Sequence, residues 1–304
     1  MRIVILGTGA LGCLFAARLA SQAEVWMLGT WAEGVAAIQR SGICVSEDGH
    51  TWRAEVHAVN DPAAVSEAHV ALLLVKSYQT ERAAAWAARC LAPDGLAITL
   101  QNGLDNGPRL AAAVGEARAV VGVTFEGATL LAPGHVRHAG RGPTYIATRP
   151  QIAARVEHIA SLLREAEFHA QTTEDVEALI WSKAVVNAAI NPLTALWRVP
   201  NGELLTNTDR RSLLAALARE GAAVAQARGV RLLFDDPVQR VEQVCRDSAT
   251  NRSSMLQDVE RGRPTEIDSI NGVIVAEGRR LGVPTPVNEI IWRLVRGLPH
   301  HHIR

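Results

Sequence analysis

The sequence is poor in lysine, in aromatic residues and in long apolar runs. Of its 304 residues 48% are hydrophobic, but only 4% are aromatic, and no stretch approaches the roughly 18 apolar residues of a transmembrane helix. Basic and acidic residues balance at 31 each, so the chain lacks the positive excess that attracts nucleic acids and anionic membranes. We therefore expect no nucleic-acid and no membrane partner.

Cysteine is scarce as well, and the chain has only Cys13, Cys44, Cys90 and Cys245. They form no CxxC pair and have no histidine at ligand spacing, so we predict four reduced thiols and no metal centre. The apolar segment that opens the chain is too short for the core of a signal peptide and runs directly into a glycine motif. These features predict a soluble, cytoplasmic protein.

The scarcity of lysine is the most informative absence. Only Lys76 and Lys183 are lysines, and the other 29 basic residues are arginines. A GC-rich genome that favours arginine codons accounts for most of this bias. Arginine cannot release a proton near neutral pH, whereas lysine can, so the two retained lysines are candidates for functional positions.

Apolar strands alternate with helices through the first 100 residues, which is typical of a parallel sheet covered on both faces. The predicted strands are Arg2–Leu6, Glu24–Leu28, Val70–Val75 and Leu96–Leu100, and the predicted helices are Leu11–Ser21, Thr30–Arg40 and Tyr78–Leu91. Short strands at 119–125, 128–131, 135–138 and 144–147 are expected to form an antiparallel or mixed edge of the same sheet, followed by a helix at 151–165 and a strand at 168–172.

Beyond Glu174 the periodicity is helical, with segments near 174–190, 208–228, 236–247, 255–261, 266–281 and 287–296. The predicted fold is α/β, with an N-terminal Rossmann-type dinucleotide-binding domain and a C-terminal all-helical substrate or catalytic domain. We place these domains at residues 1–172 and 173–304, in keeping with ~150 residues per domain.

A glycine motif joins the first predicted strand to the first predicted helix. Gly7-Thr8-Gly9-Ala10-Leu11-Gly12 reads GxGxxG in the context of a dinucleotide-binding fingerprint. Gly7 permits the tight turn, Gly9 lets the backbone approach the pyrophosphate, and Gly12 lets the helix pack closely. The helix N-terminus supplies N–H groups and a positive dipole end to the phosphates.

The end of the second strand bears on the choice of cofactor. Leu28-Gly29-Thr30-Trp31 contains neither the acidic residue typical of NAD sites nor the arginine typical of NADP sites. Thr30 could hydrogen-bond a 2′-phosphate, or it could form a capping box with Glu33 at the start of the next helix. The missing carboxylate favours NADP (as NADPH) and leaves NAD open.

Three further groups of polar residues stand where chemistry is expected. Lys76 to Gln79 and Gln101 to Gly103 follow the carboxyl ends of parallel strands, where open α/β sheets bind ligands, although they could be ordinary loops. Lys183, Asn187 and Asn191 share one face of an otherwise apolar helix. This face fits a small anionic substrate, and a solvated polar stripe is the alternative.

Two helix-boundary signals accompany these groups. Pro192 is expected to end or kink the helix that carries Asn191. Thr265 and Asp268 predict a capping box that places Glu266 in a helical first turn, so composition alone gives Glu266 no catalytic role.

Ordered motifs across nearly the whole chain resemble the ketopantoate reductase (2-dehydropantoate 2-reductase) family. They are GTGALG at 7–12, KSYQT at 76–80, QNG at 101–103, GHVRHAGRG at 134–142, WSKAVVNAAINPLTAL at 181–196, NRSSMLQDV at 251–259 and RPTEIDSINGVIV at 263–275. The resemblance implies an oxidoreductase that uses NADPH to reduce 2-dehydropantoate to (R)-pantoate, on the route to pantothenate and coenzyme A.

The resemblance also assigns roles to residues. Lys183 matches the family's proton donor, Glu266 an active-site carboxylate near the nicotinamide ribose and substrate, and Asn102 a residue that touches both cofactor and substrate. The other matches are substrate ligands at Asn187, Asn191 and Ser254 and cofactor contacts at Lys76, Gln79 and Ala128. Where the family usually has arginine for the 2′-phosphate, this chain has Thr30.

Two other functions stay open at this stage. A related reductase could make a different D-2-hydroxy acid from another 2-oxo acid, and a nucleotide-sensing regulator could bind the cofactor without turnover. The intact face of Lys183, Asn187 and Asn191 favours an enzyme. The sequence leaves the oligomeric state open, with a homodimer among the choices.

Overall fold

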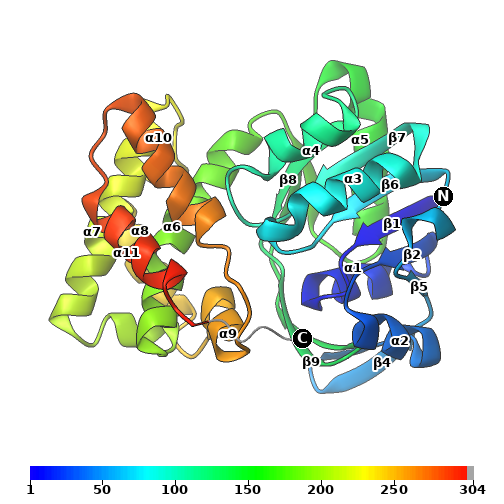
Figure 1. Cartoon of the computed structure of the whole chain (residues 1–304), viewed down its shortest axis with the longest axis horizontal. Helices are drawn as coiled ribbons and strands as arrows, with labels where there is room; N and C mark the ends of the chain where they lie inside the picture. Colours follow the sequence, from blue (N-terminus) through cyan, green and yellow to red (C-terminus); the bar gives the residue numbers. More distant parts are fainter. Residues whose placement is uncertain (300–304) are drawn as a thin grey trace. The chain divides into compact units, whose positions relative to one another are not determined.

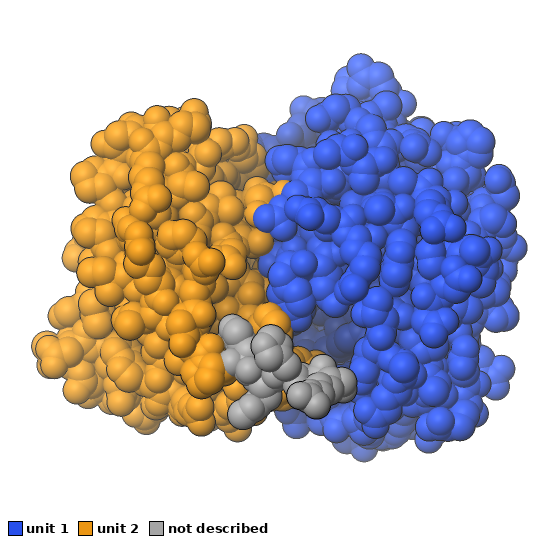
Figure 2. All heavy atoms as spheres, viewed as in Figure 1, with its two compact units in different colours: residues 1–101, 106–176 blue, residues 102–105, 177–304 orange. Residues whose placement is uncertain are grey.

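The computed structural model describes residues 1–299, and the chain divides into two compact units. Within these residues, unit 1 contains Met1–Gln101 and Asn106–Val176, and unit 2 contains Asn102–Asp105 and residues 177–299 (Figure 2). The short loop Asn102–Asp105 belongs to unit 2 because it packs there, with Leu104 N donating to Ser269 O at 2.9 Å. The domain boundary predicted after residue 172 stays a prediction.

Unit 1 is built on an eight-stranded sheet of order β12-β11-β8-β7-β6-β1-β2-β5. Its strands are β1 (Arg2–Leu6), β2 (Glu24–Leu28), β5 (His57–Val59), β6 (Ala68–Leu73), β7 (Leu91–Thr99), β8 (Ala119–Thr124), β11 (Thr144–Ala147) and β12 (Ala170–Thr173). From β5 to β8 every neighbouring pair is parallel. Strand β11 pairs antiparallel with β8 and parallel with β12, so β11 and β12 run opposite to the other six strands. The central strands β1, β6 and β8 are nearly continuous apolar runs because both faces of the sheet are covered.

Helices cover both faces of this sheet (Figure 1). On one face α3 (Thr80–Cys90) and α4 (Asn106–Val114) contribute alanines and leucines to the core. On the other face α1 (Ala10–Leu19) and α5 (Ala153–Glu165) form a second core, where Phe15 stacks on Phe168 with ring centroids 4.2 Å apart. This arrangement confirms the predicted α/β class with a Rossmann-type N-terminal part.

One part of the strand prediction is wrong. The strands near 128–131 and 135–138 do not extend the large sheet but form a separate sheet of order β4-β3-β10-β9. Its strands are β3 (Ile43–Glu47), β4 (His50–Ala54), β9 (Gly127–Ala132) and β10 (His135–Gly140). β3 and β4 were missed, although the Asp48-Gly49 turn between them, with positive φ at both residues, is a strong hairpin signal.

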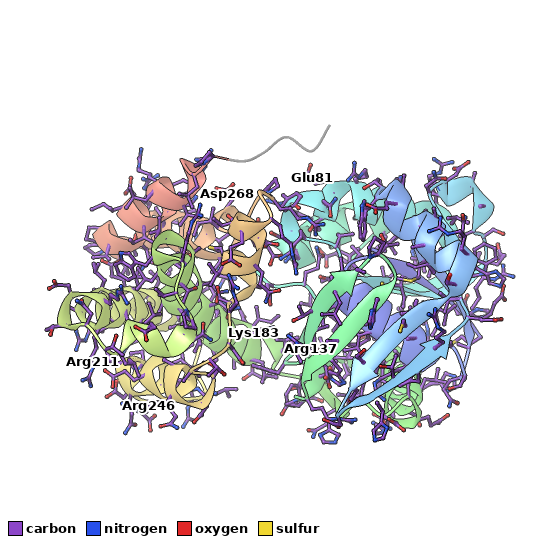
Figure 3. The ribbon with its side chains drawn as sticks, turned by 90° about the horizontal axis from the view of Figure 1, so that it is seen from below. Glu81, Arg137, Lys183, Arg211, Arg246 and Asp268 are labelled. Carbon is purple, nitrogen blue, oxygen red and sulfur yellow. The ribbon has the colours of Figure 1, made fainter. Side chains whose placement is uncertain are left out.

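Unit 2 is helical, as predicted. Its helices are α6 (Val176–Trp197), α7 (Thr208–Ala227), α8 (Pro237–Asp247), α9 (Ser254–Glu260), α10 (Val273–Leu281) and α11 (Pro286–Arg296), with a π-helical turn η5 (Asp268–Gly272) before α10. Arg211 of α7 and Arg246 of α8, both labelled in Figure 3, ion-pair with Glu242 at 2.6 and 2.8 Å. Within residues 1–299, no helix combines the length and the apolar character that crossing a bilayer requires.

Three local predictions about helix ends are wrong. The helical segment predicted near 174–190 continues through Pro192 to Trp197, so Pro192 does not end the helix. Helix α2 (Ala32–Ser41) begins after Trp31 without a side-chain cap, so Thr30 and Glu33 form no capping box. The turn after Glu266 starts as a π-helix at Asp268, also without a side-chain cap, so Glu266 does not lie in a helical first turn.

Candidate active site

The phosphate loop lies between the carboxyl ends of β2 and β6. Gly7 N donates to Leu28 O at 2.9 Å, and Leu74 N donates to Leu6 O at 2.9 Å. Gly7 has φ +123°, and a Cβ there would lie 3.0 Å from the carbonyl carbon of Leu74. Only glycine fits this crowded turn. The loop therefore stands where the strand order reverses, which is the usual ligand position in such sheets.

The loop fits the pyrophosphate of a dinucleotide. Gly9 is the N-cap of α1 and makes no side-chain cap, and a Cβ on Gly9 would meet nothing within 4 Å. The backbone is thus open on the side where the first N–H groups of α1 are presented. Ala128 of β9, the loosest of the sequence matches, packs against the same core as Ala10 and Leu11.

The loops that follow β6 and β7 are joined by Gln101. Its Nε2 donates to Val75 O and to Thr80 Oγ1, both at 2.9 Å. Lys76 is the N-cap residue of the short 3₁₀ turn η2 (Ser77–Gln79), which carries Gln79 into α3. In the sequence Gln101 is only a polar loop residue. In the structure its two hydrogen bonds fix the ends of the segment that carries Lys76 and Gln79.

The polar face predicted on α6 is present. Lys183 and Asn187 are half-buried, and Asn191 is 7% exposed, while most of their neighbours on the helix are fully buried apolar residues. Figure 3 shows Lys183 on this helix. Side chains that are buried or half-buried do not form a solvated surface face. This exposure therefore argues against the alternative that the three residues are only a solvated polar stripe.

Lys183 and Glu266 interact electrostatically. Burial lowers the pKa of Lys183 to about 8, and the negative charge of Glu266 opposes that shift. Glu266 is itself 5% exposed, and Asn102 Nδ2 donates to its Oε2 at 3.4 Å. Lys183 thus remains mainly protonated at pH 7 but gives up its proton far more readily than a surface lysine.

Ser254 is held near α6 through its neighbour in sequence. Ser253 caps α9, with its Oγ accepting from Leu256 N at 3.0 Å, and the same Oγ lies 2.7 Å from Thr194 Oγ1 of α6. Thr194 in turn donates to Asn191 O at 2.9 Å. The start of α9, where Ser254 stands half-buried, is therefore tied to the turn of α6 that carries Asn191.

Asn271 is a residue that the sequence analysis missed. Pro192 has no N–H, so the carbonyl of Ala188, four residues earlier, loses its helical donor. Asn271 Nδ2 donates to this carbonyl at 3.0 Å and also to Asn288 Oδ1 at 3.0 Å. Asn271 is fully buried. A proline inside the motif was the available signal, because an orphaned carbonyl in an apolar core requires a donor.

The predicted site residues fall into two sets. Unit 2 contains Asn102, Lys183, Asn187, Asn191, Ser254 and Glu266, and unit 1 contains the loop 7–12 with Thr30, Lys76, Gln79 and Ala128. Among residues 1–299 no group of three or more histidine, cysteine, aspartate or glutamate side chains could hold a metal ion. The first set combines one amine, one carboxylate, three amides and a hydroxyl, which suits a small oxygen-rich anion.

Comparison with known families decides the lineage of this chain. Residues 3–151 match the family described as "Ketopantoate reductase PanE/ApbA", and residues 175–299 match "Ketopantoate reductase PanE/ApbA C terminal". The chain belongs to the ketopantoate reductase family. Within that family it is 37% identical to the 2-dehydropantoate 2-reductase of Archaeoglobus fulgidus over 302 residues, which cover 98% of this chain and 97% of the relative.

Solved structures give the same family and one related activity. A PanE/ApbA family ketopantoate reductase from Ralstonia eutropha JMP134 superposes with a TM-score of 0.90 at 32% identity, covering 97% of both chains. D-mandelate dehydrogenase in a ternary structure with NADH and anilino(oxo)acetate superposes with a TM-score of 0.91 at 27% identity, again over 97% of both chains. Chains of this fold and length thus include a ketopantoate reductase and a D-mandelate dehydrogenase.

Proposed function

We propose that this protein is a cytoplasmic 2-dehydropantoate 2-reductase that uses NADPH to form (R)-pantoate. The observation that carries the proposal is the half-buried Lys183, with a pKa lowered to about 8, on one helical face with Asn187 and Asn191. The coupled carboxylate of Glu266 and the names of the curated relatives support it.

Lys183 supplies the proton of the reaction. The cofactor, when bound, provides a hydride to the carbonyl carbon at C2 of the substrate. Lys183 Nζ, in its ammonium form, stabilises the negative charge that grows on the C2 oxygen and donates the proton that completes the hydroxyl. The lysine then recovers a proton from solvent.

Other residues hold the substrate and tune the lysine. Asn187, Asn191 and Ser254 donate hydrogen bonds to the carboxylate and hydroxyl oxygens of the 2-oxo acid. Glu266 keeps Lys183 protonated, because its negative charge raises the pKa that burial lowers. Asn102 positions Glu266 through the 3.4 Å hydrogen bond from its amide.

A second candidate is a reductase for a different 2-oxo acid. The close structural match to D-mandelate dehydrogenase is the specific observation that favours it. Both activities would use the same amine and carboxylate and would differ in the residues that surround the substrate's side chain.

Steady-state kinetics separate the two candidates. The purified protein is assayed with 2-dehydropantoate, benzoylformate and a series of branched 2-oxo acids, each with NADPH and with NADH. We expect the highest kcat/KM for 2-dehydropantoate with NADPH. A kcat/KM at least tenfold higher for another 2-oxo acid would replace the proposed substrate, and absence of turnover with every acid would replace the enzyme by a nucleotide-binding regulator.

A further inference from the structure

The end of β2 is where a Rossmann-type sheet meets the adenosine ribose of its cofactor. In this chain that position is directly beside the phosphate loop, because a Cβ on Gly29 would lie 2.7 Å from Thr8 Oγ1. Thr30 follows, exposed, and the first turn of α2 adds an acidic residue, Glu33. Strand β2 and α2 thus bring no positive charge to the place where a 2′-phosphate would bind.

A positive charge reaches this place from another element. Arg82, in the first turn of α3, extends its Nη2 to within 3.5 Å of Thr30 Oγ1, across 52 positions of sequence. Its guanidinium also lies over the ring of Trp86, 5.8 Å from the centroid, one helical turn further along α3. This is a cation–π contact of the kind found at exposed sites, and it stabilises the side chain in the position from which it reaches Thr30.

In the described part of the chain no anion competes for Arg82. Among residues 1–299 its interactions are the long contact to the Thr30 hydroxyl and the contact with Trp86, and no carboxylate pairs with it. Several other exposed arginines do form ion pairs, such as Arg228 with Glu177 and Glu277. A guanidinium that is placed but unpaired can bind a phosphate dianion through two parallel N–H donors.

We propose that Arg82, together with the Thr30 hydroxyl, forms the 2′-phosphate subsite and makes this chain select NADPH over NADH. The ligand class is an adenosine ribose that carries a 2′-phosphate monoester. The inference rests on the proposed use of NADPH, and it moves the specificity-determining charge from the end of β2 to α3. Sequence inspection around Thr30 alone cannot find it.

The test measures cofactor binding in the absence of any 2-oxo acid. Dissociation constants for NADPH and NADH are determined by nicotinamide fluorescence for the wild-type chain, Arg82→Gln, Arg82→Lys and the control Arg89→Gln. Arg89 is an equally exposed arginine two turns further along the same helix. Calorimetry with adenosine 2′,5′-bisphosphate and with AMP isolates the 2′-phosphate from the nicotinamide.

Arg82→Gln should weaken the binding of NADPH and of the bisphosphate by about ten- to a hundredfold, the usual effect of losing a charge-assisted hydrogen bond. The affinities for NADH and AMP should change less than twofold in this variant. Arg82→Lys should recover part of the lost affinity for NADPH. The control Arg89→Gln should leave the affinities for NADPH and NADH unchanged. Equal weakening of NADPH and NADH, or no weakening of either, would overturn the subsite. Because no substrate is present, these results are independent of whether 2-dehydropantoate is reduced.

Discussion

The charged pair of the half-buried Lys183 and the buried Glu266 sets the acidity of the candidate proton donor. Burial alone disfavours the ammonium form, and Glu266 partly restores it, which leaves the pKa of Lys183 at about 8. A proton donor works best when its pKa lies near the working pH, because it is then largely protonated and still acidic enough to transfer the proton. An arginine in the same place would carry the charge without this ability.

The matched pair Lys183→Arg and Lys76→Arg tests this difference. Lys183→Arg should lower kcat by ~10²–10⁴, the usual contribution of a positioned acid, with a modest change in substrate KM because the cation remains. Lys76→Arg should keep most of kcat and alter mainly the KM of the cofactor. Full turnover by Lys183→Arg would show that Lys183 acts only through its charge.

The pH dependence of reduction should follow the proton on Lys183. In wild-type protein kcat/KM for the 2-oxo acid should fall above about pH 8, by tenfold per pH unit, because the ammonium form is lost. The chain has only two lysines, so NMR of ¹³C-labelled lysine should show Lys183 as one of two resolved titrations. If kcat/KM began to fall only at pH 10 or higher, that result would contradict the lowered pKa of Lys183.

Glu266→Gln should shift that titration to lower pH. The carboxylate raises the pKa of Lys183, so removing its charge leaves the effect of burial unopposed. The Lys183 signal should therefore titrate below about pH 8 in the variant, and the signal of Lys76 serves as the internal control. An unchanged Lys183 titration would mean that the two groups are not coupled, even if the variant has lost activity.

At the level of secondary structure, helix α6 is completed by a neighbouring turn. Its proline would break an isolated helix, since it removes a hydrogen bond and crowds the preceding turn. Here the carbonyl of Ala188 receives its hydrogen bond from Asn271 of the π-helical turn η5. Asn288 joins the same network by donating to Glu220 Oε2 at 2.8 Å. The substrate face of α6 is thus linked to the segment that follows Glu266.

A double-mutant cycle measures how far Asn271 replaces the hydrogen bond that Pro192 removes from the carbonyl of Ala188. Asn271→Ala leaves a buried carbonyl without a donor and should reduce the free energy of unfolding by roughly 1–3 kcal/mol for that group. In a Pro192→Ala background the new backbone N–H of residue 192 can serve Ala188, so the same change should cost at least ~1 kcal/mol less. Urea denaturation of the four proteins gives the coupling. Strict additivity would show that Asn271 does not replace the missing donor.

At the scale of the whole molecule, unit 1 contains a charge cluster, buried at Arg18 and His138, that joins its smaller sheet to α1. His138 of β10 hydrogen-bonds Glu47 and Glu126, each at 2.6 Å, and Arg18 of α1 pairs with Glu47 and with Glu167. The hydrogen bond that His138 donates to Glu126, together with the nearby negative charges, raises the pKa of His138 despite burial. Burial opposes ionisation of Glu47, but Arg18, His138 and Arg141 outweigh it and lower its pKa.

These shifts predict a window of maximum stability. The raised pKa of His138 stabilises unit 1 fully below about pH 6.5, its unfolded value, and this contribution disappears as pH rises through the folded pKa. The lowered pKa of Glu47 stabilises unit 1 above about pH 4.3 and is lost as pH falls through its folded pKa. The cluster should therefore contribute most between these two values.

His138→Gln should consequently destabilise the protein more at pH 6 than at pH 9. Thermal unfolding of wild type and variant at both pH values gives the comparison, and the gap in Tm should narrow at the higher pH. A gap of constant size would mean that the charge on His138 does not stabilise the fold.

Local sequence patterns were sufficient for much of this molecule. The GxGxxG loop and the spacing of Lys183, Asn187 and Asn191 depend on a few adjacent residues and on the period of one strand or helix, so both were predicted directly. The alternation of apolar strands and helices predicted the large parallel sheet. The helical periodicity beyond Glu174 predicted the helical unit 2. The hairpin at Asp48-Gly49 was also readable from local sequence and was overlooked.

The remaining features depend on contacts between distant segments. Arg82 reaches Thr30 across 52 positions, Asn271 reaches Ala188 across 83, and Asn102 reaches Glu266 across 164. Periodicity and propensity describe neighbours along the chain, whereas these pairs are set by how helices and loops pack. The lowered pKa of Lys183 has the same origin, because burial and the nearness of a carboxylate exist only once the chain is folded.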